Sequence, residues 1–228
     1  MDNKPPLSPE EARVLAVLVE KQHTVPDSYP LSLNALTLGC NQKTAREPVM
    51  QMSEADVLQA INGLKERSLV NEVSGSRVVR FDHNAARGLG VPSQSAALLT
   101  ILMLRGPQTS AELRLHTERL HRFADVSSVE GFLEEMAEKT PPRVQKLAKG
   151  PGEREHRWVH LLCGETHAQA QAARPFASSA LADTTAPGRV QDEDLATLKA
   201  EQARMAAELA ELRALVMKMA AELGIQAG

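Results

Sequence analysis

"SEADVLQAINGLKERSLVNEVSGSRVVRF", residues 53–81, joins a helix signal directly to a hairpin signal. Ser53 and Asp56 form a short capping box, in which two side chains satisfy free N–H groups at a helix start. Behind this start, two β-prone runs flank Ser74-Gly75-Ser76, which predicts a β-hairpin. Between the two signals, apolar residues recur with helical period at Val57, Leu58, Ile61 and Leu64.

Two more helices are predicted upstream of this stretch. Ser8 and Glu11 form a capping box with Pro9 at the first helical position, and a helix is expected over residues 9–22. A second helix is expected to begin near Ser32. Its buried face is expected to hold Leu33, Leu36 and Cys40. Three helices followed by a hairpin is the order of a winged helix-turn-helix domain.

The same order recurs further along the chain. An apolar helix is expected over residues 95–106, and capping boxes at Thr109/Glu112 and Ser127/Glu130 predict two more. A shift of 75 residues superposes Ser53 on Ser128, and a second hairpin follows over residues 143–162. We therefore predict a mostly α fold with small β-hairpins (α+β). It consists of two tandem winged helix-turn-helix domains, at residues 1–84 and 85–163.

The last third of the chain follows different patterns. Residues 164–192 are rich in Ala, Ser, Thr, Gln and Pro, and we expect a flexible linker there that could contain a helical turn. Residues 193–223 carry a heptad seam over four heptads, which predicts a coiled-coil helix that joins two copies in a homodimer. A single amphipathic helix that packs on its own domain is the alternative. The predicted seam consists of Leu195, Leu198, Gln202, Met205, Leu209, Leu212, Val216, Met219 and Leu223.

Charge gives little support for nucleic-acid binding. The 228 residues carry a formal net charge of −3. Residues 1–84 have 9 basic against 11 acidic residues, residues 85–163 have 11 against 9, and residues 164–228 have 6 against 9. A strongly basic face is the usual footprint of a nucleic-acid-binding protein, and no segment has that composition.

The sequence also indicates where the protein is located and how its cysteines are used. No run of 18 apolar residues occurs, and the first residues lack the apolar core of a signal peptide. The two cysteines, Cys40 and Cys163, form neither a disulfide framework nor a zinc knuckle. We therefore expect a cytoplasmic protein without a membrane partner.

Residues 33–50, "LNALTLGCNQKTAREPVM", resemble a family of uncharacterised bacterial proteins usually called YceH-like. The upstream stretch from Glu11 to Asn34 is similar to the same family, and the likeness covers roughly residues 7–163. The resemblance implies two winged-helix domains, often with a C-terminal helix. It implies no established activity, so it leaves the function open.

The sequence offers no catalytic or cofactor site. Cys40 is expected to be buried near a helix C-terminus, where a thiolate is disfavoured, and Asn41 is expected to end that helix in a left-handed conformation. His156 and His160 are four apart and are expected to share an exposed strand face without a third ligand. We therefore predict no metal, no cofactor and no enzymatic activity.

Two functions of different classes follow from these patterns. The first, which we favour at this point, is a regulatory protein that binds double-stranded DNA through the first domain's third helix and the hairpins. The second is a scaffold that binds a protein partner. The third helix of the second domain would expose Glu130, Glu134, Glu135 and Glu138, which would repel phosphates. The candidate nucleic-acid contacts are Lys43, Arg46, Gln59, Asn62, Lys65, Arg77, Arg80, Lys149, Arg154 and Arg157.

Overall fold

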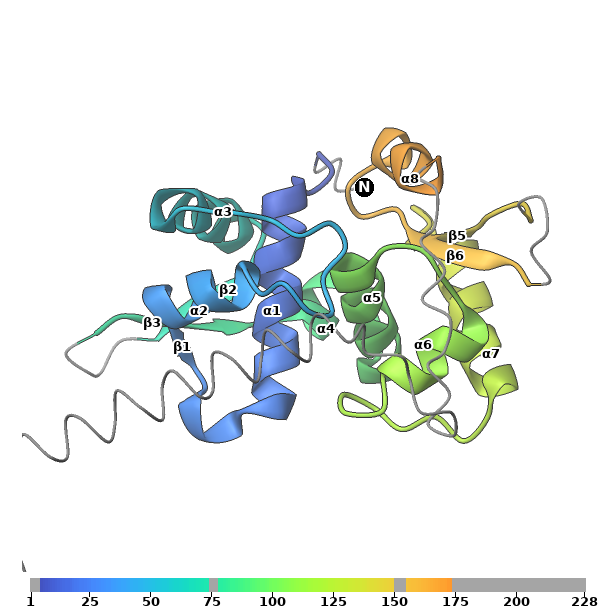
Figure 1. Cartoon of the computed structure of the whole chain (residues 1–228), viewed down its shortest axis with the longest axis horizontal. Helices are drawn as coiled ribbons and strands as arrows, with labels where there is room; N and C mark the ends of the chain where they lie inside the picture. The colour runs from blue at the N-terminus through green and yellow to red at the C-terminus, as the bar shows by residue number, and fades with distance from the viewer. Residues whose placement is uncertain (1–4, 74–77, 150–154, 174–228) are drawn as a thin grey trace, which may run out of the picture. The chain divides into compact units, whose positions relative to one another are not determined.

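A computed structural model describes residues 5–73, 78–149 and 155–173, which lie in one compact unit, Met1–Pro175 (Figure 1). The first half, residues 5–83, contains α1 (Pro9–Thr24), a 3-10 turn (Pro26–Ser28), β1 (Leu31–Ser32), α2 (Leu33–Cys40), α3 (Glu54–Glu66), β2 (Val70–Val73) and β3 (Arg80–His83). After α4 (Ala85–Leu89), the second half contains α5 (Ser93–Arg105), β4 (Gln108–Thr109), α6 (Ser110–His116), α7 (Val126–Glu138), β5 (Val144–Lys146), β6 (Arg157–His160) and α8 (Glu165–Ala172). The described chain is thus a mostly helical α+β structure whose elements are consistent with two winged-helix arrangements.

Three of the four predicted capping boxes are confirmed. Ser8 caps α1, where its backbone N–H donates to Glu11 at 2.8 Å and its hydroxyl accepts from the Glu11 N–H at 3.1 Å. Ser53 with Asp56 caps α3, and Thr109 with Glu112 caps α6. The local sequence therefore fixes where these helices begin.

The fourth box is wrong, because α7 begins one residue before Ser127. Asp125 is the N-cap and exchanges hydrogen bonds with Ser128, so the Ser127/Glu130 pair does not form the cap. The inward residues of α7 are Val129, Leu133 and Met136, which each lie 72 positions after Val57, Ile61 and Leu64 of α3. The repeat shift in this helix is therefore 72 and not 75.

Each predicted hairpin is confirmed, and each gains a third strand. The sheets are antiparallel with the orders β1-β3-β2 and β4-β6-β5. Their registers correspond, since His83 lies opposite Val70 in the first sheet and His160 lies opposite Val144 in the second. The additional strands, β1 and β4, have two residues each, which is too short for a period-2 pattern to be visible in the sequence.

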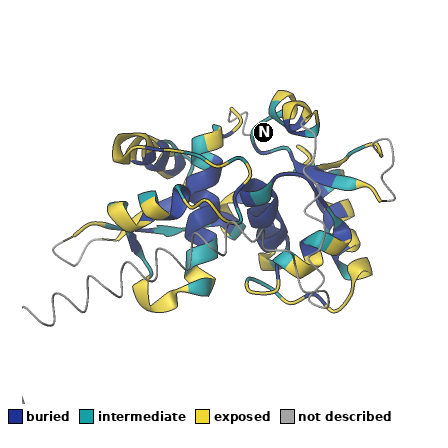
Figure 2. Cartoon of the chain, in the orientation of Figure 1, coloured by how far each residue is buried: buried dark blue, intermediate teal, exposed yellow. Residues whose placement is uncertain are grey.

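The two halves share one hydrophobic core around α1 and α5. Residues 12–19 of α1 and 95–104 of α5 are all buried, and Figure 2 shows both helices largely in the colour of buried residues. A helix buried on every side needs neighbours on every side. Helix α1 packs against α2, α3, β3 and α5, while α5 also packs against α6, α7 and β6.

Several remaining predictions concern the ends of elements. Helix α1 ends two residues later than residue 22, and α8 forms inside the segment predicted to be a linker. The rest of that linker and the predicted coiled-coil seam at 193–223 lie outside the described residues, so the homodimer stays a prediction. Among the described helices, none has the length and apolar character needed to cross a membrane.

Candidate interaction surface

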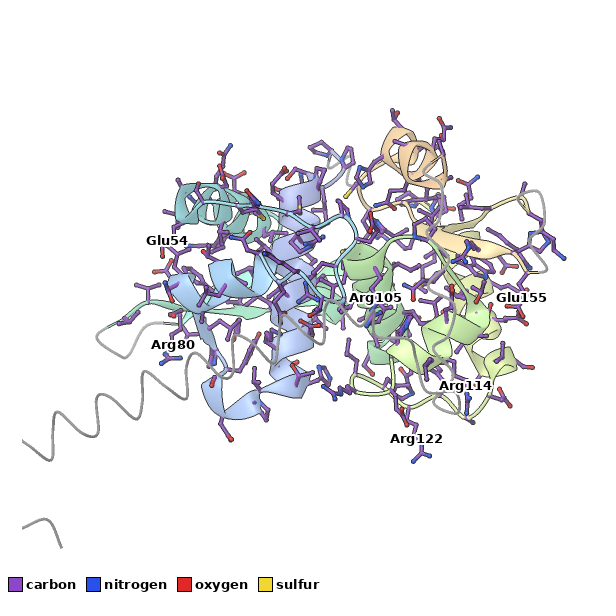
Figure 3. All side chains as sticks on the ribbon, in the orientation of Figure 1. Glu54, Arg80, Arg105, Arg114, Arg122 and Glu155 are labelled. Carbon is purple, nitrogen blue, oxygen red and sulfur yellow. The ribbon has the colours of Figure 1, made fainter. Side chains whose placement is uncertain are left out.

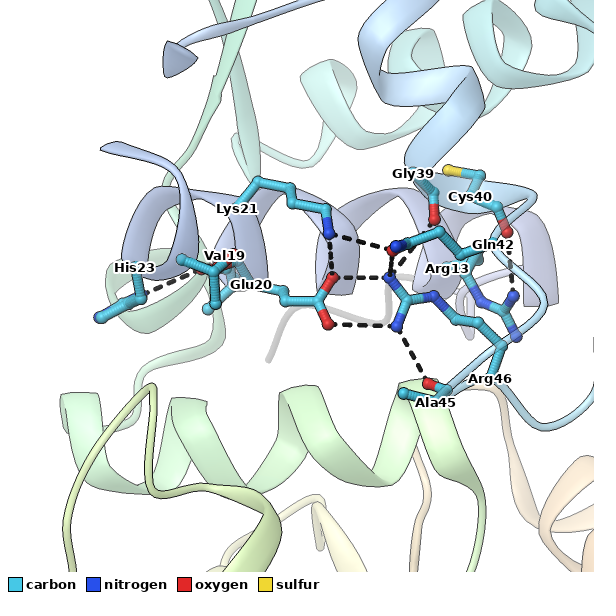
Figure 4. Close-up of polar contacts among 11 residues, drawn as sticks. Arg13, Val19, Glu20, Lys21, His23, Gly39, Cys40, Gln42, Ala45 and Arg46 are labelled. Carbon is cyan, nitrogen blue, oxygen red and sulfur yellow. Dashed lines mark hydrogen bonds and ion pairs between the residues drawn. The ribbon is translucent and has the colours of Figure 1, made fainter. Parts of the chain in front are cut away.

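The connector between α2 and α3, residues 41–53, is held to the core by a buried arginine. Arg46 is only 5% exposed, and its guanidinium pairs with both carboxylate oxygens of Glu20, at 3.1 and 2.6 Å (Figure 4). It also donates to the Gln42 side chain at 2.7 Å and to the carbonyl oxygens of Gly39 and Ala45. Burial alone would raise the pKa of Glu20, but the hydrogen bonds and charge of Arg46 outweigh it and lower that pKa.

Hydrogen bonds of three further residues, Arg13, Asn41 and Glu47, also hold the connector in place. Arg13, 2% exposed on α1, donates to the Cys40 carbonyl at 3.1 Å and to the Pro48 carbonyl at 2.6 Å. The Asn41 side chain both donates to and accepts from the Met52 backbone, at 2.8 and 2.7 Å. The Glu47 N–H donates to the Leu104 carbonyl of α5 at 2.7 Å. The connector therefore joins α1, α2 and α5, and binds the two halves together.

Cys40 is fully buried, as its helical spacing predicts. Burial raises the pKa of its thiol to about 12, although Arg13 and Arg46 oppose that shift. The prediction for Asn41 is half right. Asn41 ends α2 as expected, but its φ of −91° is not left-handed. The left-handed residue of the connector is Ala45, with a φ of 58°.

A groove of about 500 Å³ lies between α2, α3 and the wing, strands β2 and β3 with the adjoining residues 78 and 79. We call it the α3–wing groove. Its polar rim includes Glu54, Lys65 and Glu72, and Figure 3 marks Glu54 beside α3 and Arg80 on the sheet of the same half. Its apolar lining consists of Leu33, Leu58, Val78, Val79 and Phe81.

Four of the candidate nucleic-acid contacts are already engaged within the protein. Arg46 is buried, which is incompatible with the exposed role predicted for it. Lys65 pairs with Glu72 at 2.5 Å. Arg80 donates to the Pro30 carbonyl at 2.7 Å, and Arg157, 77 positions later, donates to the Pro107 carbonyl at 3.2 Å and pairs with Glu112 at 2.8 Å. The two strand arginines thus support their own sheets in equivalent ways.

The other six candidates fall into two groups. Lys43, Gln59, Asn62 and Lys149 are exposed, as predicted. Arg77 and Arg154 lie outside the described residues. The acidic face of α7 is confirmed, since all four of its predicted glutamates, Glu130, Glu134, Glu135 and Glu138, are exposed.

One cluster was missed by the sequence analysis. His160, Cys163 and His167 each offer a ligand atom, and these atoms all lie within 4.8 Å of one another. The prediction that His156 and His160 share an exposed face is wrong. Strand β6 begins only at Arg157, and His160 is 2% exposed whereas His156 is exposed. The close spacing of His160, Cys163 and His167 in the sequence could have revealed the cluster. It was missed because the three residues lie across the boundary between the second predicted domain and the predicted linker.

Fold and surface together define a tandem α+β protein whose helix–strand halves share one core. A protein-family model described as "Protein of unknown function, DUF480" matches residues 7–153 of this chain. A "UPF0502 protein" of Paraburkholderia phytofirmans is 62% identical over 225 residues, which cover 96% of this chain and 89% of the relative. UPF0502 proteins of Burkholderia pseudomallei and Cupriavidus taiwanensis are each 61% identical over 222 residues, which cover 97% of this chain and 91% and 89% of the relatives. The chain belongs to this DUF480/UPF0502 family, the YceH-like bacterial proteins.

Proposed function

We propose that this chain is a non-catalytic interaction protein built from two winged-helix domains, and that its α3–wing groove binds a segment of a protein partner. The carrying observation is the exposure of apolar side chains in that groove. Leu58 is 42% exposed and Val79 is 47% exposed. Single exposed apolar residues are ordinary, but several that line one groove are typical of a protein-binding site.

The position of the groove supports this proposal. In winged-helix proteins that bind DNA, the third helix enters the major groove and the wing contacts the backbone or minor groove. In this chain five apolar residues, together with six polar ones, line the space between the same two surfaces. Phosphates and sugars would gain little from such a lining, whereas apolar anchors of a peptide segment would be removed from water there.

Charge around α3 indicates the kind of segment. A second cleft, of about 960 Å³, also borders α3 and is lined by Glu10, Glu11, Asp56 and Glu66 beside a single arginine, Arg67. Arg67 lies 3.7 Å from Glu11 and donates to the Pro5 carbonyl. We therefore expect the partner segment to present apolar side chains flanked by lysine or arginine, since these cations complement the carboxylates.

Binding of double-stranded DNA is the second candidate function. Gln59 and Asn62 favour it, because both are exposed on α3 and their amides could contact adenine edges. Against it stand the internal contacts of Arg46, Arg80 and Arg157, and the carboxylates of both third helices. Most contacts to phosphate come from cations that are free to reach it.

Site-specific photo-cross-linking separates the two functions. A photoreactive amino acid replaces Leu58 in the full chain expressed in bacterial cells, and Leu115, which is 52% exposed on α6, is replaced in a matched control. The proposal predicts a discrete protein adduct from position 58 that is weak or absent from position 115, and that disappears when Val79→Glu is added. Adducts to nucleic acid, or protein adducts of equal yield from both positions, would contradict it.

A further inference from the structure

A group of nitrogen and sulfur side chains lies at the end of the second sheet, apart from the α3–wing groove. Strand β6 ends at His160, the chain turns through Leu161 to Gly164, and α8 begins at Glu165. Gly164 makes this turn with φ 86° and hydrogen-bonds to the Leu161 carbonyl at 2.9 Å. The turn brings His167, in the first turn of α8, back toward His160.

From this geometry we propose that His160, Cys163 and His167 bind a zinc ion. One ring nitrogen of each histidine and the Cys163 sulfur lie within 4.8 Å of one another. Tetrahedral zinc with Zn–N bonds of about 2.0–2.1 Å and a Zn–S bond of about 2.3 Å needs ligand atoms roughly 3.3–3.6 Å apart. Side-chain rotations that bring the three ligand atoms closer together by roughly 1 Å would therefore give the distances that tetrahedral zinc requires.

The burial of His160 supports a ligand role. The residue is 2% exposed, and its Nδ1 has no hydrogen-bond partner among the described residues. A buried polar atom of this kind normally has a partner, and a metal ion would supply one.

Gln171 provides a natural second layer around His167. Its side-chain nitrogen lies 3.0 Å from Nε2 of His167, while its Oε1 is buried without a partner among the described residues. If zinc binds Nδ1 of His167, the ring proton is fixed on Nε2. Turning the Gln171 amide over then lets Oε1 accept a hydrogen bond from the Nε2–H group, as outer partners of metal-bound histidines generally do.

Cys163 completes the set as the soft ligand. It is a free, half-buried cysteine whose Sγ lies 3.7 Å from the Ser8 carbonyl oxygen. When zinc binds, the thiol releases its proton to the solvent, and the zinc–thiolate bond replaces the contact between Cys163 and Ser8. Two nitrogens and one sulfur suit zinc, and a water can occupy the fourth position.

The test uses the purified full chain, stripped of metal with a chelator and kept reduced. Titration with Zn²⁺ in competition with a chromophoric chelator should give one ion per chain. Co²⁺ alone should give a thiolate-to-cobalt charge-transfer band and the intense visible bands of a tetrahedral site. His167→Ala should weaken zinc binding by at least about 100-fold, since loss of an outer partner alone costs roughly 10- to 100-fold. Cys163→Ser should abolish the charge-transfer band.

Two matched variants control for the other histidines and the other thiol. His156→Ala removes an exposed histidine just before β6, and Cys40→Ala removes the buried thiol of α2. Both should retain the one-to-one zinc binding and the cobalt band. His167 is only half-buried on α8, so His167→Ala should keep the native circular dichroism, and the Co²⁺ spectrum of the unmodified chain tests the site without any variant. Absence of saturable zinc binding, or binding unchanged in both His167→Ala and Cys163→Ser, would overturn the proposal.

Discussion

Arg46 shows how a charged residue in a polar stretch can belong to the core. Its side chain pairs with Glu20, 26 positions earlier, and also donates to the carbonyl oxygens of Gly39 in α2 and Ala45 in the connector. A surface pair contributes little to stability, but breaking a buried pair leaves a charge without compensation. The connector that separates α2 from α3 is therefore a structural tie.

The first prediction follows from that pair. Arg46→Ala should lower the free energy of unfolding by about 3 kcal/mol, because the largely buried Glu20 would keep only Lys21, at 3.1 Å, as a partner. Lys43→Ala, an exposed change in the same connector, should stay within about 0.5 kcal/mol of the unmodified protein. Urea unfolding followed by circular dichroism measures both. Equal effects of the two substitutions would mean that the Arg46–Glu20 pair is not what holds the connector.

His83 makes the stability of the first half depend on pH. Burial, helped by His23, lowers its pKa from 6.5 to about 4 in the folded chain. Between these values the unfolded chain binds more protons, so the stabilisation is present above pH 6.5 and is lost as the pH falls toward 4. The full difference amounts to at most about 3 kcal/mol. His83→Gln should flatten the curve of unfolding free energy against pH in this window, and an unchanged slope would contradict this assignment.

At the scale of elements, helix α7 shows why local signals can mislead. Asp125/Ser128 and Ser127/Glu130 are overlapping start signals, and each is acceptable alone. The start is decided by which residues face the core, here Val129, Leu133 and Met136. We expect Asp125→Ala to cost about 1 kcal/mol of stability and Ser127→Ala close to nothing. Stability is measured by thermal or urea unfolding. A larger loss from Ser127→Ala than from Asp125→Ala would show that Ser127, and not Asp125, caps α7.

Much of the fold could be predicted because its signals are local. Capping boxes and helical periodicity placed α1, α2, α3, α5 and α6, and the turn residues placed both hairpins. The burial of Arg46 could not be predicted, because its partners Glu20 and Gly39 are brought to it only by tertiary packing. The group at His160 and Cys163 was missed for a similar reason, since the turn that brings His167 back depends on Gly164 and on the start of α8.

At the scale of the whole described unit, the shared core should make the two halves unfold together. Trp158 is the only tryptophan and is buried in the second half, while Cys40 is buried in the first. In a Cys163→Ser background, Cys40 is the only thiol, so its labelling reports the first half and Trp158 fluorescence the second. We expect both to change at one urea concentration. Labelling of Cys40 well below the fluorescence midpoint would show that the halves are independent.

A destabilising substitution in α5 should shift the unfolding midpoints from both Cys40 labelling and Trp158 fluorescence. Leu102 is fully buried in α5, and Leu102→Ala should remove about 2–5 kcal/mol of stability through the cavity that it leaves. Because α5 packs against α1, the midpoints from Cys40 labelling and Trp158 fluorescence should fall by the same amount. A shift confined to Trp158 would contradict a shared core.

The central claim is that the surface formed by α3 and the wing binds protein, while the cations around it serve the fold. The most direct measurement is the affinity of the full chain for a random DNA duplex over a range of salt concentrations. A protein that neutralises Z phosphates shows a log–log slope of about −0.9Z. We predict a slope near zero and no change with Lys43→Glu or Lys149→Glu. A steep negative slope that becomes shallower in these variants would contradict the claim and establish DNA binding.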